Sequence, residues 1–415
     1  MFSEFGKLER PLQIMWAFIA AVTAANLYSW LRYFQPAPFT DMVDLEWFLT
    51  GWSLGEDGLI PLIKYPDNEH RAFLPVLLQT LDHKLFASTG LFLIIVHIGC
   101  FAVLAASFAR HAWLGAGGPA AGGQSRLAQA SAGAMVLVML WSAHWNNIIR
   151  TKQTHVCLAL LFVAIAFWLA ARLDASRSRG DGARVEDWPA LLALSGMLIG
   201  AAWSFTAGLA AIPVMLGFAV ARRWSWRATA VLLVASAVAL GGYAWAVSGG
   251  PGGPEKTATG LFTFVLFFLN LSGGLFHHAL AGDEIAAPIF AGLSLVAAAA
   301  LLRYNFSNKA RARVGLDAGQ NRAASFFSLF ILWSVVCAVA ITASRAQFGP
   351  EQGFVTRYLA FGVCFVTATA MLGLVFRRLI PTNLRRFAVF VLGFYLVAII
   401  AVTPRGWVVA ADHNR

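Results

Sequence analysis

Residues 66–75 read PDNEHRAFLP and crowd titratable and anion-binding side chains between two prolines. Glu69 and His70 can exchange protons or order a sugar, and the Arg71 guanidinium can pair with a phosphate. The stretch precedes an apolar run, so its alternative role is an acid-rich helix start near a membrane interface. One Glu and one His without ligand-type spacing do not predict a metal site. Only 12% of the chain is charged, so this concentration makes Glu69, His70 and Arg71 candidate site residues.

Two carboxylates open the segment DMVDLEWFLTGWSL, residues 41–54. Asp41 sits where a helix N-cap is expected, and Asp44 follows one turn later on nearly the same side. The pair either caps the helix and favours its dipole, or takes a proton from an incoming hydroxyl and binds a cation. Both are therefore candidate catalytic residues, with no metal site assigned and a divalent cation as an open alternative. An amphipathic helix on the membrane surface is predicted from a stripe of Val43, Trp47, Phe48, Leu49 and Leu54.

A second polar segment, RAQFGPEQGFVTRY at residues 345–358, carries Arg345 and Arg357 on either side of one tight turn. Guanidinium groups bind phosphate bidentately, so this arrangement favours a phosphate clamp with Tyr358 beside it. The alternative is that each arginine extends from a helix end to lipid headgroups. In both roles the segment lies at the membrane surface.

The segment WNNIIRTKQTH, residues 145–155, adds amide and basic side chains. Asn147, Arg150 and Gln153 are candidate substrate-binding residues, because helix counting places this segment on the same side as the two above. An ordinary polar loop would have a similar composition.

The elements that must position these residues are transmembrane helices. The chain has 415 residues, is 59% hydrophobic and has a mean hydropathy of +0.68. Its uninterrupted apolar runs reach about 20 residues, the length that crosses a bilayer core. Clear runs cover residues 11–31, 88–108, 127–145, 155–173, 228–248, 284–302, 323–343, 355–376 and 387–403. With the less clearly divided segments 188–221 and 257–281, these predict an all-α polytopic transmembrane bundle of about ten to twelve spans, as one integral membrane domain over residues 1–415.

Arginine and lysine mark the loops that face the cytoplasm. The loops at 303–322 and 377–386 are rich in arginine, so we expect them inside, and helix counting places the large loop 32–87 outside. Eight of the chain's twenty acids fall in that outer loop, which favours a catalytic role for it. The arginines that follow 188–221 conflict with this helix counting. Arg222, Arg223 and Arg227 are also expected inside, but three apolar segments separate them from the inside loop at 303, and three crossings would place them outside. Either 188–221 is a single crossing with an irregular middle, or 257–281 is a re-entrant hairpin broken at its glycine pair.

The remaining composition excludes other classes. The net charge of +11 comes from short clusters between spans without interleaved aromatic residues, so no nucleic-acid partner is expected. The adjacent His277 and His278 point about a hundred degrees apart on a helix, cannot easily share a metal, and are expected at an interface. The cysteines fall inside apolar runs and are predicted to be packed thiols: Cys100, Cys157, Cys337 and Cys364.

These segments together resemble the GT-C class of integral membrane glycosyltransferases, which use polyprenyl-phosphate sugars. The resemblance rests on a first helix followed by a large outer loop with an early Asp, here FTDMVDLE, and on many further spans with short loops. The chain also resembles a group of bacterial multi-pass proteins with NEHR, NN…Q and R…FG.E…RY elements. These correspond to residues 68–71, 146–153 and 345–358.

The resemblance implies transfer of a sugar, with inversion, from a polyprenyl-phosphate donor to a glycan or lipid acceptor of the cell envelope. It implies that Asp41, or failing it Asp44, is the catalytic base, and that the protein resides in the bacterial cytoplasmic (inner) membrane. Arg71, Arg345 and Arg357 would neutralise the phosphate, while a groove between spans would hold the polyprenyl chain. No cofactor is firmly implied.

Two other classes stay open on the residues alone. A transporter or lipid flippase would use broken helices, for which 188–221 and 257–281 are the candidates. An envelope polysaccharide polymerase or ligase acting on lipid-diphosphate donors would use outer arginines in the same way. The glycosyltransferase hypothesis expects Asp41, Glu69 and Arg357 to converge on one outward cavity.

Overall fold

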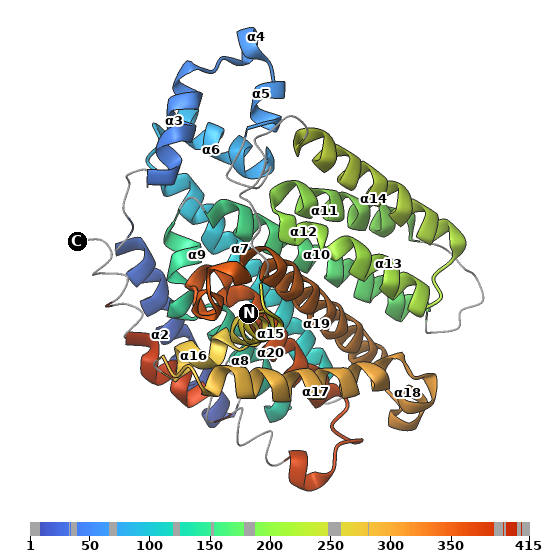
Figure 1. Ribbon diagram of the computed structural model, residues 1–415. Coiled ribbons are helices and arrows are strands. Elements are labelled where there is room, and N and C mark those ends of the chain that lie inside the picture. The colour runs from blue at the N-terminus through green and yellow to red at the C-terminus, as the bar shows by residue number, and fades with distance from the viewer. Residues whose placement is uncertain are drawn as a thin grey trace.

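The computed structural model describes residues 9–32, 34, 40–65, 73–118, 125–150, 153–177, 187–247, 259–280, 282–385, 393, 396–404 and 408. Throughout these residues the regular elements are helices, which confirms the predicted all-α fold (Figure 1). Eight helices in the described ranges are long and apolar enough to cross a membrane, so the predicted integral membrane bundle is confirmed. They are α2 (Arg10–Arg32), α7 (Leu91–Gly115), α8 (Arg126–Met139), α10 (Thr154–Arg177), α14 (Trp226–Val247), α17 (Ala286–Phe306), α19 (Ala318–Arg345) and α20 (Leu359–Val375). Of the predicted span 387–403, the structure describes only residues 393 and 396–403.

The long helices run between two ends of the bundle, and the arginine-rich segments gather at one of them. Glu9, just before α2, pairs with Arg126 at the start of α8 at 2.5 Å. Arg377, just after α20, donates from Nη1 to the carbonyl oxygen of Gly115 at the end of α7, at 3.4 Å. We call this the basic end and the opposite one the polar end. The grouping agrees with the loop sides predicted from arginine content.

The segment 188–221 forms a hairpin that returns to the basic end. It comprises α11 (Trp188–Ser204), α12 (Thr206–Leu209) and α13 (Ala211–Ala221). Asp187, just before α11, pairs with Arg172 at 3.4 Å, and Arg222, just after α13, pairs with Asp174 at 2.6 Å. Both partners lie on the last turns of α10, so the single-crossing alternative is wrong. The hairpin adds two shorter apolar segments, Trp188–Ser204 and Thr206–Ala221, to the eight long helices of the described ranges.

The bend of this hairpin lies where the sequence predicts an irregular middle. Phe205 is extended, with φ −164° and ψ 152°, and ends α11. A Cβ on Gly208 would lie 1.9 Å from the carbonyl oxygen of Ala201, so only glycine fits where the chain turns back. Trp333 of α19 donates from Nε1 to the carbonyl oxygen of Ala207 at 2.9 Å. That bond connects the bend to α19 and so holds it against the bundle.

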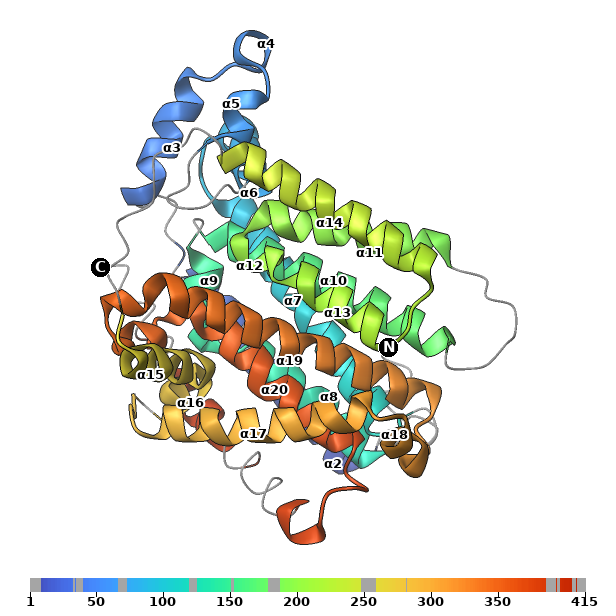
Figure 2. The same ribbon diagram turned by 45° about the vertical axis from the view of Figure 1, so that its right-hand side comes forward.

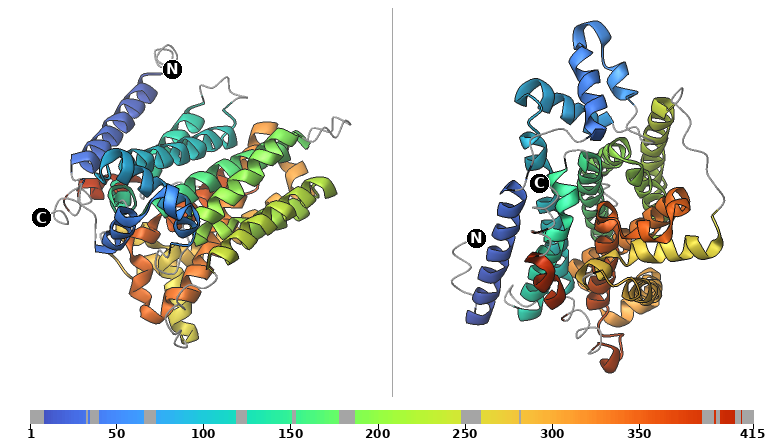
Figure 3. Two further views of the ribbon diagram at one scale, coloured as in Figure 1. Left: turned by 90° about the horizontal axis from the view of Figure 1, so that it is seen from above. Right: turned by 60° about the vertical axis from the view of Figure 1, so that its left-hand side comes forward.

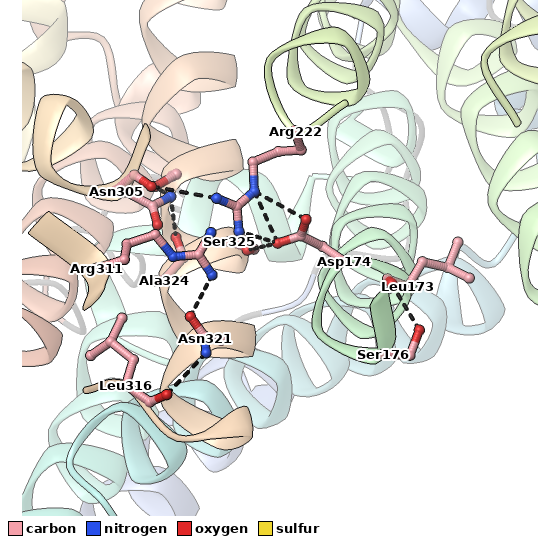
Figure 4. Close-up of polar contacts among 11 residues, drawn as sticks. Leu173, Asp174, Ser176, Arg222, Asn305, Arg311, Leu316, Asn321, Ala324 and Ser325 are labelled. Atoms are coloured by element: carbon pink, nitrogen blue, oxygen red, sulfur yellow. Dashed lines mark hydrogen bonds and ion pairs between the residues drawn. The ribbon is translucent and has the colours of Figure 1, made fainter. Parts of the chain in front are cut away.

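A buried ion pair attaches the hairpin to the bundle at the basic end (Figure 4). The Arg222 and Asp174 side chains are each 6% exposed. Arg222 Nε lies 3.0 and 3.1 Å from the two carboxylate oxygens, and Nη2 lies 2.6 Å from one of them. Ser325 of α19 donates its hydroxyl to the same carboxylate at 2.6 Å, and Arg222 Nη1 donates to the carbonyl oxygen of Asn305 at 3.4 Å. These additional hydrogen bonds are what a buried charge pair requires to be tolerated.

The elements α15 (Leu261–Ser272) and α16 (Gly274–Ala279) do not cross the bundle. Asn270 of α15 and His278 of α16 both contact the turn before α20, through bonds of 2.9 and 3.0 Å to its carbonyl oxygens. Gly273 separates the two helices. A Cβ there would lie 2.2 Å from the carbonyl oxygen of Ala287, so only glycine allows this close approach to α17. In the right-hand view of Figure 3, α15 lies across the long helices. The arrangement matches the re-entrant alternative for 257–281.

Four helices between α2 and α7 form a hood at the polar end (Figure 1). They are α3 (Thr40–Gly51), α4 (Leu54–Asp57), α5 (Ile60–Ile63) and α6 (Phe73–Phe86). The hood has its own hydrophobic core of Leu45, Leu49, Trp52, Leu62 and Val76. Lys84 Nζ lies 3.5 Å from the carbonyl oxygens of Leu49 and of Trp52, so a cation stabilises the carboxyl end of α3.

The predicted amphipathic helix of residues 41–54 corresponds to α3. Of its apolar stripe, Leu49 is buried in the hood core, whereas Trp47 and Leu54 are exposed. Since α3 begins at Thr40, Asp41 lies in its first turn and not at the N-cap as predicted. Figure 1 shows that the amino end of α3 lies toward the bundle and the carboxyl end at the tip of the hood.

Two introduced cysteines test the orientation of the two ends. We expect the basic end to face the cytoplasm, because arginine and lysine are retained there. An impermeant maleimide applied to intact cells should label Gly55→Cys on α4 and leave Ala312→Cys on α18 (Asn308–Val314) unlabelled, while broken cells label both. Both positions are exposed and the four native thiols are buried, so the background is low. Stronger labelling at position 312 in intact cells would reverse the orientation.

Candidate functional site

The polar-end turn, residues 346–358, joins α19 to α20 and carries the second predicted cluster. It consists of the short helices η3 (Ala346–Phe348), η4 (Pro350–Phe354) and η5 (Thr356–Tyr358). Gly349 has φ +101°, and a Cβ there would also lie 2.2 Å from Oε1 of Glu351. Only glycine adopts this conformation without strain. The turn therefore folds back tightly enough to bring the two ends of the segment to one site.

Arg345 and Arg357 line a common hollow of about 230 Å³, together with Phe348, Gln352 and Tyr358. The Arg345 guanidinium lies 5.8 Å from the centre of the Phe348 ring, and that of Arg357 lies 5.0 Å from the centre of the Tyr358 ring. Arg357 is exposed, and among the described residues no carboxylate forms an ion pair with it. The aromatic contact of Arg357 holds its guanidinium group without neutralising it, so the hollow can receive an anion there.

The amide segment at 145–155 meets this turn, as its predicted position on the same side requires. Asn146 and Asn147 lie on α9 (Trp145–Ile149). The Asn146 amide donates to the hydroxyl oxygen of Thr356 at 2.7 Å, and the Asn147 amide donates to the carbonyl oxygen of Thr356 at 3.4 Å. Thr356 directly precedes Arg357, so two of the predicted polar segments form one structure.

His97 of α7 positions α9 from inside the bundle. One ring nitrogen, Nδ1, lies 2.8 Å from the carbonyl oxygen of Ile148, and Nε2 lies 2.8 Å from the hydroxyl of Thr154. A carbonyl oxygen only accepts, so Nδ1 carries the proton and a neutral ring accepts from Thr154 at Nε2. The Cys157 thiol donates to the carbonyl oxygen of Asn147 at 3.1 Å. The side chain of Asn147 is thus anchored through its own backbone.

The re-entrant helices hold the other side of the polar-end turn, and Figure 2 shows α9, α15 and α16 at the same end of the bundle. Asn270 donates from Nδ2 to the carbonyl oxygen of Pro350 at 2.9 Å. His278 Nε2 lies 3.0 Å from the carbonyl oxygen of Phe354, while the His277 ring stacks on the Phe354 ring at 4.0 Å. Both histidines therefore join α16 to the turn.

Asp283 belongs to this end but acts as a helix cap. Its Oδ1 accepts from the backbone N–H groups of Ile285 and Ala286 at 2.8 and 2.9 Å, at the start of α17. These two bonds hold the pKa of Asp283 below its usual value. The carboxylate is therefore stabilised in its charged form.

The remaining predicted site residues fall into three groups, according to whether the structure describes their side chains, only their helix, or neither. Gln153 is 8% exposed and directly precedes α10, and Arg150 is half-buried at the end of α9. Asp41 and Asp44 lie on the described helix α3, but their side chains lie outside what the structure describes. The candidates Glu69, His70 and Arg71 lie outside the described residues altogether. The expected convergence with Arg357 on one cavity therefore stays a prediction.

Two site residues escape the sequence reasoning: Thr356 and Asn270. Asn270 had a usable signal, because it is a lone amide inside the apolar run LFTFVLFFLNLS. Thr356 had none, since its role depends on contacts with a segment about two hundred residues earlier. Within the described ranges, no group of three or more His, Cys, Asp or Glu side chains could hold a metal ion.

Comparison of the chain with protein-family models, with curated proteins and with solved structures finds no match. The resemblance to the GT-C class therefore rests on the residues of this sequence.

Proposed function

We propose that the protein is a membrane glycosyltransferase that moves a sugar from a polyprenyl-phosphate donor to a cell-envelope acceptor at the polar end. The observation that carries this proposal is the hollow between Arg345 and Arg357. It lies at the end of the transmembrane helices, where a lipid phosphate would lie, and offers two guanidinium groups to an anion. The hood lies at the same end, and its helix α3 includes Asp41 and Asp44.

The roles follow from the chemistry of the transfer. The acceptor hydroxyl needs a base, for which Asp41 or Asp44 at the bundle side of the hood is the candidate. The departing polyprenyl phosphate needs positive charge, which Arg345 and Arg357 supply on one side and Arg71 would supply on the other. Glu69 and His70, beside Arg71 in the sequence, would order the sugar or exchange a proton. Tyr358 supports the Arg357 guanidinium through its ring.

Arg357 variants test the phosphate role. Arg357→Ala should lower kcat/KM by about 10- to 100-fold, the scale of one lost hydrogen-bonded charge contact. Arg357→Lys should retain only part of the unmodified kcat/KM, because an ammonium group keeps the charge but cannot bind the phosphate bidentately. The measurement is release of polyprenyl phosphate when the purified full chain transfers sugar from a panel of decaprenyl-phosphate sugars to an added cell-envelope glycan or lipid acceptor.

The control variant is Arg385→Lys, an exposed arginine at the basic end, which should leave the rate unchanged. Normal kcat/KM in both Arg357 variants would mean that this residue only anchors the helix. The phosphate-clamp assignment would then be abandoned.

A transporter or lipid flippase is the second candidate, and the broken helices at Phe205 and Gly273 favour it. Vesicles reconstituted with the protein separate the two functions. A flippase would move a fluorescent polyprenyl-phosphate sugar between leaflets without altering it. The proposed enzyme would release polyprenyl phosphate.

A further inference from the structure

A set of buried amides surrounds the polar-end turn with unused carbonyl oxygens. Asn146, Asn147, Gln153 and Asn270 are 7%, 0%, 8% and 4% exposed. In each, the side-chain oxygen has no hydrogen-bond donor among the described residues. We call these four residues the amide set. They combine deep burial with open acceptors, a state that proteins normally avoid.

The orientation of two of these amides is fixed by their partners. Asn147 and Asn270 each direct their Nδ2 group to a backbone carbonyl oxygen, at 3.4 and 2.9 Å. A carbonyl oxygen cannot donate, so a flipped amide would place two acceptors against each other. In both residues Oδ1 is therefore the atom without a described hydrogen-bond donor.

The density of such groups distinguishes this place from the rest of the bundle. Asn305 at the basic end also leaves its Oδ1 without a described donor, but it lies alone on α17. An unmet buried acceptor costs about 1–3 kcal/mol, so four of them would use up much of the stability of a typical domain. A ligand that supplies donors would remove this cost. Three members of the set, Asn146, Asn147 and Asn270, contact the same turn that forms the arginine hollow.

We propose that the amide set binds the hydroxyl groups of the sugar while the Arg345–Arg357 hollow holds the phosphate of the same lipid. This inference rests on the proposed function and specifies how the donor is recognised. Amide oxygens accept hydrogen bonds, and a sugar presents several hydroxyl donors. A fully ionised phosphate and a polyprenyl chain present none. The set therefore distinguishes a sugar-bearing lipid phosphate from the bare lipid phosphate that is left after transfer.

Binding measurements on the full chain in detergent test whether the amide set recognises the sugar and the arginine hollow recognises the phosphate. The probes are decaprenyl phosphate and decaprenyl phosphates that carry glucose, mannose, galactose or arabinose. Asn147→Ala and Gln153→Met should each weaken binding of the preferred sugar lipid by about 10- to 100-fold, because each removes an acceptor from a dry site. Binding of bare decaprenyl phosphate should change less than about twofold, and Asn305→Ala should change neither.

Each alternative outcome has a definite meaning. Failure of the unmodified protein to bind decaprenyl phosphate or any sugar lipid would overturn the proposed function. Binding of decaprenyl phosphate without preference for any sugar lipid would overturn the amide inference and leave the phosphate site standing. Equal losses for both kinds of lipid would show that the amides only position the turn. If Asn147→Ala fails to fold, Gln153→Met decides, because the Gln153 side chain forms no hydrogen bond with the turn.

Discussion

Asp41→Asn should give a protein that folds normally but turns over its donor at least about a hundredfold more slowly, the scale of general-base catalysis. Asparagine keeps the size and hydrogen-bonding shape of aspartate and removes the charge. Asp41 lies in the first turn of α3, so losing its charge there weakens the helix dipole interaction by only about 0.3–1 kcal/mol. A large rate effect with little change in stability would therefore identify a base.

The matched variant is Asp44→Asn, one turn further along the same helix. If Asp44 is the base, it should carry the hundredfold loss and Asp41→Asn should be nearly normal. Stability is followed by melting in detergent, and turnover by release of polyprenyl phosphate. Full activity in both single variants and in the double variant would remove the hood carboxylates from the mechanism.

The membrane-spanning helices were predictable because their signal is local. A run of about 20 apolar residues specifies a crossing without reference to the rest of the chain. The run at 228–248 became Trp226–Val247, and that at 284–302 became Ala286–Phe306. Arginine content likewise grouped the loops correctly, because each loop carries its own charge.

The hairpin at 188–221 could not be resolved in this way. A turn inside a continuous apolar run leaves the hydropathy unchanged, and α13 has only 11 residues. What decides the topology is the pairing of Arg222 with Asp174, 48 residues apart in the chain. Such a pairing follows from tertiary structure, which apolar run lengths do not encode.

In the candidate site as well, local features were predictable from the sequence and long-range contacts were not. Arg345 and Arg357 were predictable because a short turn lies between them, and a turn keeps its flanks together. Their connection to Asn147 was predicted only as a common side of the membrane, whereas the structure joins them through Thr356. Asn270 reaches the turn because α15 re-enters, which no single-segment pattern reveals.

Removing the positive half of the buried ion pair should destabilise the bundle by about 3–5 kcal/mol, because it leaves a charge buried without its partner. In Arg222→Met, Asp174 would keep the hydrogen bond from the Ser325 hydroxyl but lose the guanidinium group that balances its charge. The measurement is the free energy of unfolding in mixed detergent micelles. The exposed pair at the other end of the hairpin supplies a matched control, since Arg172 and Asp187 are 51% and 37% exposed. Arg172→Met should cost less than about 1 kcal/mol.

The double variant Asp174→Leu with Arg222→Met distinguishes two causes of instability: loss of the attraction within the ion pair, and burial of a carboxylate without its partner. Removing both charges eliminates the desolvation penalty together with the attraction, so stability should return to within about 1–2 kcal/mol of the unmodified protein. If the double variant is as unstable as Arg222→Met, the cost lies in the packing of the hairpin against α19 and not in the uncompensated carboxylate. If Arg222→Met is no less stable than Arg172→Met, the pair does not attach the hairpin, and α11 and α13 are held by their apolar contacts alone.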